Sequence, residues 1–169
     1  MKELKIYRLL SFILLPFGIM FGIEDLSFLF SALGNPPLLL SVFLLACIVI
    51  YIFSSFIFLY KAILKSSPCK RSLRDLIRVN AIVSIIFCLL CILSCIFFIF
   101  LFNDPALLSE FTKQISTQSK SSFPFNFNDP EFLAAAKRSV AIMLPFSILL
   151  LIHIIISFRM MKRFIHLFQ

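Results

Sequence analysis

Polar side chains are rare in the apolar stretches of this sequence, so they mark where chemistry inside a membrane would occur. His153 is the residue in these stretches that titrates near neutral pH. Ser84, Ser54 and Ser55 would lie at a similar depth if each stretch crosses a bilayer as a helix. With Asn80 they form a candidate intramembrane polar cluster around His153.

Two interpretations of this cluster remain open. In one, His153 is part of a proton or ligand relay. In the other, it is a neutral histidine that is hydrogen-bonded to a serine or to a backbone carbonyl. The second interpretation is favoured because the cluster contains no second ionisable partner.

Three cysteines, Cys88, Cys91 and Cys95, recur at helical spacing. At 100° per residue they fall with Asn80 and Ser84 within about 80° of arc. Thiols at i and i+3 of a continuous helix are badly placed for a disulfide, and membrane burial disfavours the thiolate that binds metal. We therefore expect no catalytic residue, no metal site and no cofactor here, and interpret the stripe as a surface where helices pack closely.

Gly18 and Gly22 form a GxxxG motif with Ser11 on the same helical face. Small residues at this spacing let two membrane helices approach closely. The motif therefore predicts a second helix-packing surface.

The composition requires a lipid environment for these elements. Hydrophobic residues make up 61% of the 169 residues and charged residues 14%, and the mean hydropathy is +1.06. A soluble domain keeps roughly a quarter of its residues charged. The composition also excludes a disordered tail, a collagenous repeat and a disulfide-rich secreted module.

The lengths of the apolar stretches predict an all-α integral membrane protein, a single domain over residues 1–169 with four transmembrane helices in a bundle. A bilayer core takes about 20 helical residues. A cleaved signal peptide at the start is the disfavoured alternative, because no small-residue cleavage site follows closely. The predicted helices cover about 6–23, 38–61, 73–102 and 130–160.

Two connections have predicted structure of their own. The run Gly34-Asn35-Pro36-Pro37 must break a helix. It leaves 26–33 as a short segment that we expect at the interface with Asp25 as its N-cap, and a continuation of the first helix is the open alternative. In the outer loop, 103–129, Asp104 and Pro105 start a short amphipathic helix, and Asp129 and Pro130 start the last span in the same way.

Basic residues predict the orientation, because Lys and Arg collect on the cytoplasmic side of membrane proteins. Of the 16 Lys and Arg, 12 lie within 2–8, 61–78 or 159–163. Both termini are therefore expected in the cytoplasm and the 103–129 loop outside. The net charge of +8 favours anionic lipid headgroups as partners and disfavours nucleic acid, which needs aromatic residues interleaved on a folded platform.

No motif identifies a reaction or a transported solute. We expect a non-enzymatic multi-pass protein of a bacterial cytoplasmic membrane, a structural or accessory subunit that associates with lipid, with a second copy or with another membrane protein. The first alternative is a small transporter or channel with a polar path near 73–102 and 130–160. The second is a membrane-bound enzyme, disfavoured for want of paired catalytic groups.

Overall fold

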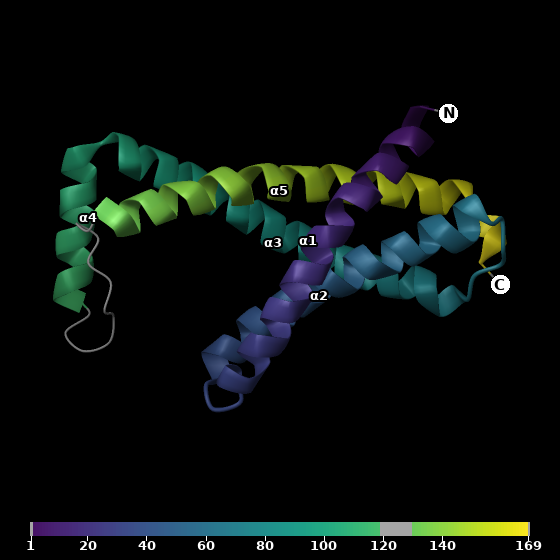
Figure 1. Cartoon of the computed structure of the whole chain (residues 1–169), viewed down its shortest axis with the longest axis horizontal. Helices are drawn as coiled ribbons and strands as arrows, with labels where there is room; N and C mark the ends of the chain where they lie inside the picture. Colours follow the sequence, from purple (N-terminus) through teal and green to yellow (C-terminus); the bar gives the residue numbers. More distant parts are fainter. Residues whose placement is uncertain (1, 119–129, 169) are drawn as a thin grey trace. The chain divides into compact units, whose positions relative to one another are not determined.

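The computed structural model describes residues 2–118 and 130–168, and this part of the chain is helical with no strand (Figure 1). Four of its helical segments are long and apolar enough to cross a membrane, as the sequence predicts. In chain order the elements are α1 (Lys2–Ala32), α2 (Pro36–Phe58), the π-helix η1 (Leu59–Leu64), α3 (Arg71–Asn103), α4 (Pro105–Gln118), α5 (Pro130–Arg163) and the 3-10 helix η2 (Ile165–Leu167).

The chain divides into two compact units. Unit 1 comprises Met1–Cys88 and Leu149–Gln169, and unit 2 comprises Leu89–Ile148. Unit 1 therefore holds α1, α2, η1, the first part of α3 and the last part of α5. Unit 2 holds the remainder of α3, α4 and the start of α5.

The structure corrects the predicted end of the first span. Helix α1 does not stop near residue 23; it continues to Ala32, so 26–33 is not a separate interfacial segment. Asp25 is an interior residue of α1 and not an N-cap, and the Ser27 hydroxyl donates to the Ile23 carbonyl at 3.0 Å across this region. A 31-residue helix is roughly 46 Å long and exceeds a bilayer core of about 30 Å, so polar residues near its end do not require a break.

The turn that ends α1 has the predicted position. Asn35 is extended at the N-cap of α2 and Pro36 begins the helix, where a missing N–H is tolerated. The other predicted spans agree within a few residues, although the end of the second continues as η1. The amphipathic helix predicted after Asp104 is α4.

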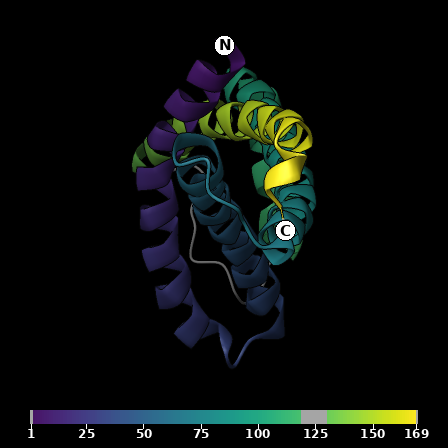
Figure 2. The ribbon, with the colours of Figure 1, turned by 90° about the vertical axis from the view of Figure 1, so that its right-hand side faces the viewer.

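In unit 1, α1 and α2 form an antiparallel hairpin and lie side by side over most of their length (Figure 2). Gly18 permits their close approach, because a Cβ at this position would lie 2.8 Å from Ile52 Cγ2. At Gly22 the corresponding distance to Val49 Cγ1 is 3.6 Å, an ordinary van der Waals contact. The GxxxG face of α1 therefore packs against α2.

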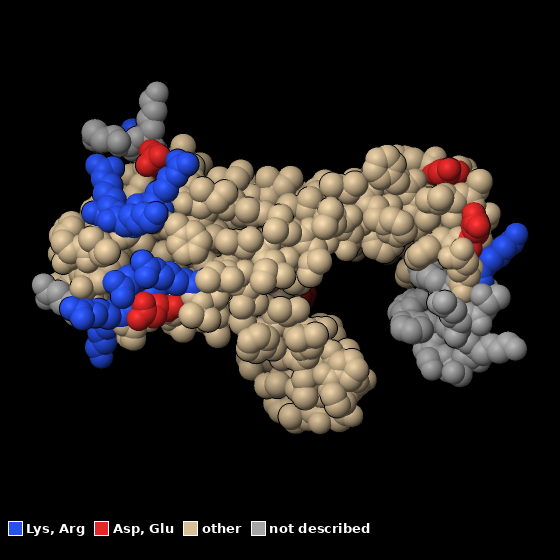
Figure 3. All heavy atoms as spheres, turned by 180° about the vertical axis from the view of Figure 1, so that it is seen from behind, with Lys and Arg blue, Asp and Glu red and all other residues tan. Residues whose placement is uncertain are grey.

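One end of unit 1 brings together the start of α1, the loop after η1 and the residues after α5. The Cys69 N–H donates to the Leu167 carbonyl at 2.7 Å, and the rings of Phe58 and Phe168 stack with centroids 5.4 Å apart. Lys and Arg side chains gather at this end (Figure 3).

In unit 2, α4 is capped as the sequence predicts and packs on α3. The Asp104 carboxylate accepts hydrogen bonds from the Ala106 and Leu107 N–H groups at 2.9 and 3.2 Å. The Phe97 and Phe111 rings meet edge to face with centroids 5.9 Å apart. The corresponding prediction for Asp129 lies outside the described residues.

Candidate functional site

Three helices of unit 1 each contribute an aromatic residue and a serine four positions later to one buried cluster. Such i and i+4 side chains share a face of a helix. All six residues are at most 2% exposed. This tyrosine–histidine cluster consists of Tyr7 and Ser11 of α1, Tyr51 and Ser55 of α2, and His153 and Ser157 of α5.

His153 is held at both ring nitrogens. Its Nε2 lies 2.9 Å from Ser11 Oγ, and its Nδ1 lies 2.8 Å from the Tyr51 hydroxyl. These are ordinary hydrogen-bond lengths. The imidazole therefore links α5 to α1 and to α2 at the same time.

Tyr7 covers the imidazole and closes the cluster. Its ring stacks on His153 with centroids 4.9 Å apart and an interplanar angle of 9°. Its hydroxyl donates to the Ser55 carbonyl of α2 at 3.1 Å. Because a buried phenol needs a hydrogen-bond partner, this bond lets Tyr7 lie wholly inside the protein.

The hydrogen-bond partners assign the His153 tautomer. The Ser11 hydroxyl donates its one hydrogen to the Tyr7 carbonyl at 2.8 Å, so towards Nε2 it acts as an acceptor. Nε2 therefore carries the ring hydrogen and Nδ1 accepts from the Tyr51 hydroxyl. A neutral imidazole satisfies both bonds, which makes His153 a cross-link between helices.

Ser157 is the member of the cluster with unused hydrogen-bonding capacity. It is 1% exposed, and its hydroxyl lies beside the Tyr7 and Tyr51 side chains without forming a hydrogen bond of good geometry among the described residues. Leaving a buried hydroxyl unpaired costs about 1–3 kcal/mol.

The residues that the sequence analysis placed around His153 are buried but bond elsewhere. The hydroxyls of Ser54 and Ser55 donate to the Tyr51 and Ile52 carbonyls of α2. The Asn80 amide and the Ser84 hydroxyl donate to the Leu76 and Asn80 carbonyls of α3. Of these four residues, Ser55 belongs to the tyrosine–histidine cluster, because its backbone carbonyl accepts the hydrogen bond from the Tyr7 hydroxyl.

Sequence reasoning missed Tyr7, Ser11, Tyr51 and Ser157 as members of the cluster. Tyrosine was counted as an apolar residue, which hid its hydroxyl. The signal that could have found them is the shared spacing: in three separate helices a hydrogen-bonding ring is followed by serine at i+4.

The cysteine stripe on α3 points largely into the protein. Cys88 and Cys95 are buried, Cys91 is half-buried, and all five cysteines of the chain are free thiols. Within residues 2–118 and 130–168, no three His, Cys, Asp or Glu side chains are grouped so that they could hold a metal ion.

A second polar group faces an apolar pocket of unit 1. Asp25 lies with Phe28, Leu38 and Phe87 around a space of about 270 Å³. One carboxylate oxygen of Asp25 is buried and has no hydrogen-bond partner among the described residues. The other lining residues are Ser41, Val42 and Leu45, so this pocket supplies no cation to pair with the carboxylate.

Comparison of the chain with protein-family models, with curated proteins and with solved structures finds no match.

Proposed function

We propose that this chain is a non-enzymatic multi-pass membrane protein that serves as a structural or accessory subunit. The observation that carries the proposal is the state of His153, whose two ring nitrogens are both used to join helices of the same chain. A relay histidine needs a nitrogen that can exchange its partner during turnover. A histidine bonded on both sides and stacked under Tyr7 instead holds α1, α2 and α5 together.

The exposed surface of α3 supports an accessory role. Large apolar side chains project from this helix, and Ile82, Ile86 and Leu93 are each more than half exposed. Lipid tails or the helices of another membrane protein would cover such a surface. We propose that the partner is a second copy or a different membrane protein that packs on this face.

The proposal includes a location and an orientation. The four spans would form one bundle in a bacterial cytoplasmic membrane, with both termini in the cytoplasm and α4 on the outer side. The distribution of Lys and Arg supports this orientation. The same basic residues would contact anionic lipid headgroups.

Site-specific photo-crosslinking in intact membranes tests the accessory role. A photoreactive residue at Ile86 of α3 should give a crosslinked product of defined mass, whereas the same residue at Ile77, which is fully buried, should give none. The mass of the product distinguishes a second copy from a different protein. Crosslinking to lipid alone at Ile86 contradicts the proposal.

A small transporter or channel with a polar path beside α3 and α5 is the second candidate. The buried polar side chains of unit 1 favour it, because the Ser157 hydroxyl has no hydrogen bond of good geometry among the described residues and could bond a permeating solute or water. Proton flux into proteoliposomes, followed with a trapped pH-sensitive dye, separates the candidates. Flux that disappears in a folded His153→Ala variant would favour transport.

A membrane-bound enzyme ranks third, and no described group of residues supports a particular reaction.

A further inference from the structure

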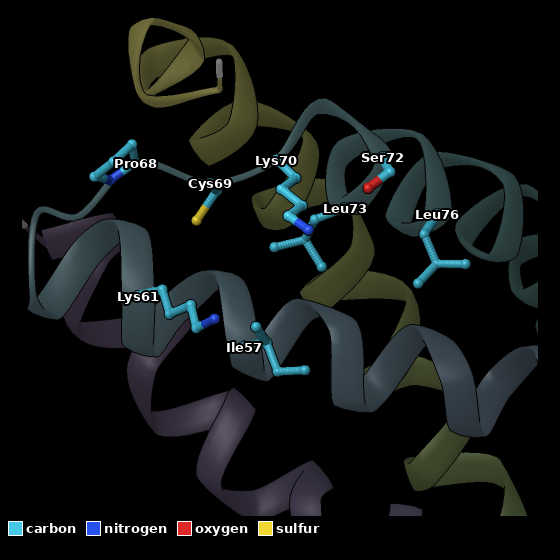
Figure 4. A pocket seen from close by; sticks show the side chains of 8 residues that line it. All are labelled: Ile57, Lys61, Pro68, Cys69, Lys70, Ser72, Leu73 and Leu76. Carbon is cyan, nitrogen blue, oxygen red and sulfur yellow. The ribbon is translucent and has the colours of Figure 1, made fainter.

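A pocket of about 430 Å³ lies in unit 1 where the second candidate span ends and the third begins (Figure 4). Its walls come from α2, η1, the loop after η1 and the first turns of α3. The lining residues are Ile57, Lys61, Pro68, Cys69, Lys70, Ser72, Leu73 and Leu76. The pocket therefore lies at the end of two spans and not midway along them.

Two ammonium groups point into this space. Lys61 extends from η1 and Lys70 precedes α3, and the amine ends of both are directed into the gap between the two helices (Figure 4). Neither lysine forms an ion pair within the part of the chain that the structure describes, whereas Arg74 pairs with Asp75 at 3.2 Å. The pocket therefore presents uncompensated positive charge.

The part of the pocket further along the two helices from the lysines is apolar (Figure 4). Ile57 and Leu76 line it, and they are 43% and 45% exposed on the outer surface of their helices. A ligand with its charge at the lysines would therefore have an uninterrupted apolar surface beside it. Between Pro36 and Ile57 α2 carries no charged residue, and α3 carries none after Arg78, so lipid tails would lie along these segments.

We propose that this pocket binds one phospholipid with an anionic headgroup, whose phosphate lies between Lys61 and Lys70 and whose acyl chains follow Ile57 and Leu76. The ammonium groups and the Ser72 hydroxyl are donors suited to phosphate oxygens. The combination of charged mouth and lipid-facing apolar wall distinguishes a lipid from a free anion. The site does not depend on whether the chain is an accessory subunit or a transporter.

Native mass spectrometry of the full-length protein in detergent tests the site. Phosphatidylglycerol is titrated in, and the dissociation constant of the first bound lipid is measured. The double variant Lys61→Gln and Lys70→Gln should weaken this first binding about tenfold or more. Each single variant should lose part of the affinity, so the test remains decisive if the double variant does not fold.

The matched control removes the same charge at the same end of unit 1 but outside the pocket. Lys162 and Arg163 end α5 and do not line the pocket, so Lys162→Gln with Arg163→Gln should change the first dissociation constant less than about threefold. Equal weakening in the two double variants would mean diffuse surface attraction and would overturn the site.

Two further ligands distinguish the lipid from other anions. Zwitterionic phosphatidylcholine should bind the wild-type protein more weakly than phosphatidylglycerol, and less sensitively to the two lysines. Inorganic phosphate should not displace phosphatidylglycerol, because it makes no contact with Ile57 and Leu76. Displacement by inorganic phosphate would show that the pocket takes a free anion and would overturn the lipid assignment.

Discussion

The hydroxyl of Tyr51 is a single group on which the tyrosine–histidine cluster depends. It donates to His153 Nδ1 at 2.8 Å, and both residues are buried. Tyr51→Phe keeps the ring and removes the donor, which leaves a buried nitrogen unpaired. We expect a loss of about 1–3 kcal/mol in the free energy of unfolding, measured by thermal unfolding in detergent.

Tyr60 provides the matched control for this substitution. It is 48% exposed, and its ring, which Phe would retain, lies under the Lys65 ammonium. Tyr60→Phe should leave the unfolding temperature unchanged. If Tyr51→Phe also unfolds at the wild-type temperature, the bond from Tyr51 to His153 is not a stabilising link.

A second residue-scale prediction concerns the thiol of Cys69. Burial raises the pKa of this thiol above its ordinary value, and the nearby Lys61 ammonium acts in the opposite direction. Since the thiolate is the reactive form, alkylation of Cys69 should be slow at neutral pH and accelerate in alkaline solution. Lys61→Gln removes the positive charge that lowers the pKa of the Cys69 thiol. In this variant the alkylation of Cys69 should therefore accelerate only at a higher pH.

The rate of iodoacetamide labelling at Cys69, followed by mass spectrometry of its peptide between pH 7 and 10, checks this expectation. Lys162→Gln serves as the control, since Lys162 does not line the pocket around Cys69. A labelling curve that is the same in Lys61→Gln and in the wild-type protein would show that the lysine does not act on the thiol. An intramolecular disulfide in the native protein would contradict the free thiols of this structure.

At the scale of helical elements, Gly18 sets the distance between α1 and α2. Replacing glycine with alanine inside a helix ordinarily stabilises it by roughly 0.5–1 kcal/mol. At Gly18 the new methyl would lie 2.8 Å from Ile52 Cγ2 and 3.3 Å from Ile52 Cβ. These atoms are next to the backbone and move little, so Gly18→Ala should cost about 1–3 kcal/mol by overpacking.

The same motif contains the control for this prediction. At Gly22 the added methyl meets Val49 Cγ1 at 3.6 Å, so Gly22→Ala should unfold at or above the wild-type temperature. Ile52→Ala removes the atom that clashes and should make Gly18→Ala less costly in a double-mutant cycle. Equal unfolding temperatures for Gly18→Ala and Gly22→Ala would mean that Gly18 does not limit the approach of the helices.

The cysteine stripe gives a second prediction for an element. Ser84 and Cys88 of α3 are fully buried, and Cys95 is 5% exposed. Leucine at Ser84 or Cys88 should lower the free energy of unfolding by about 1–3 kcal/mol through overpacking, whereas alanine should have little effect. Equal damage from Cys88→Ala and Cys88→Leu would instead indicate chemistry at the sulfur.

Ser94 is the control for the substitutions on α3. It lies on the exposed side of the same helix, so Ser94→Leu should be tolerated in detergent and in lipid. Unfolding temperatures of the Ala and Leu variants are compared side by side. Tolerance of leucine at Ser84 and Cys88 equal to that at Ser94 would show that the stripe faces lipid.

Elements were predictable from sequence because their causes are local. Charge-free length gave the four spans, and proline with an aspartate cap placed the start of α4. The prediction of a separate segment over 26–33 was wrong because Glu24 and Asp25 lie inside α1 and do not end it. A long helix can carry acidic residues through its last turns, and α1 continues past these two residues to Ala32.

At the scale of the whole chain, contacts between distant residues could not be predicted from local patterns. Ser11 and His153 are 142 positions apart, and nothing in either neighbourhood specifies the other. Sequence analysis singled out the histidine, and it left open whether a serine or a backbone carbonyl is its hydrogen-bond partner. It could not choose Ser11 over Ser54 or Ser84, because that choice depends on the rotation of three helices about their axes within unit 1.

Membrane orientation is the remaining whole-molecule prediction. The start of α1, the 65–70 loop and the end of α5 lie at one end of unit 1, where Glu3 pairs with Arg159 at 3.3 Å and the Cys69 N–H bonds to the Leu167 carbonyl. These segments should therefore share one side of the membrane, and the excess of Lys and Arg predicts that this side is cytoplasmic. Alkaline phosphatase, which is active outside the cytoplasm, should be inactive when fused after Gln169 or within 65–70. It should be active when inserted after Gly34 or within 119–129.

Two outcomes would contradict this prediction. Activity of the fusion after Gln169, with none for the insertion within 119–129, would reverse the orientation. Different results for the fusions within 65–70 and after Gln169 would contradict the four-span arrangement.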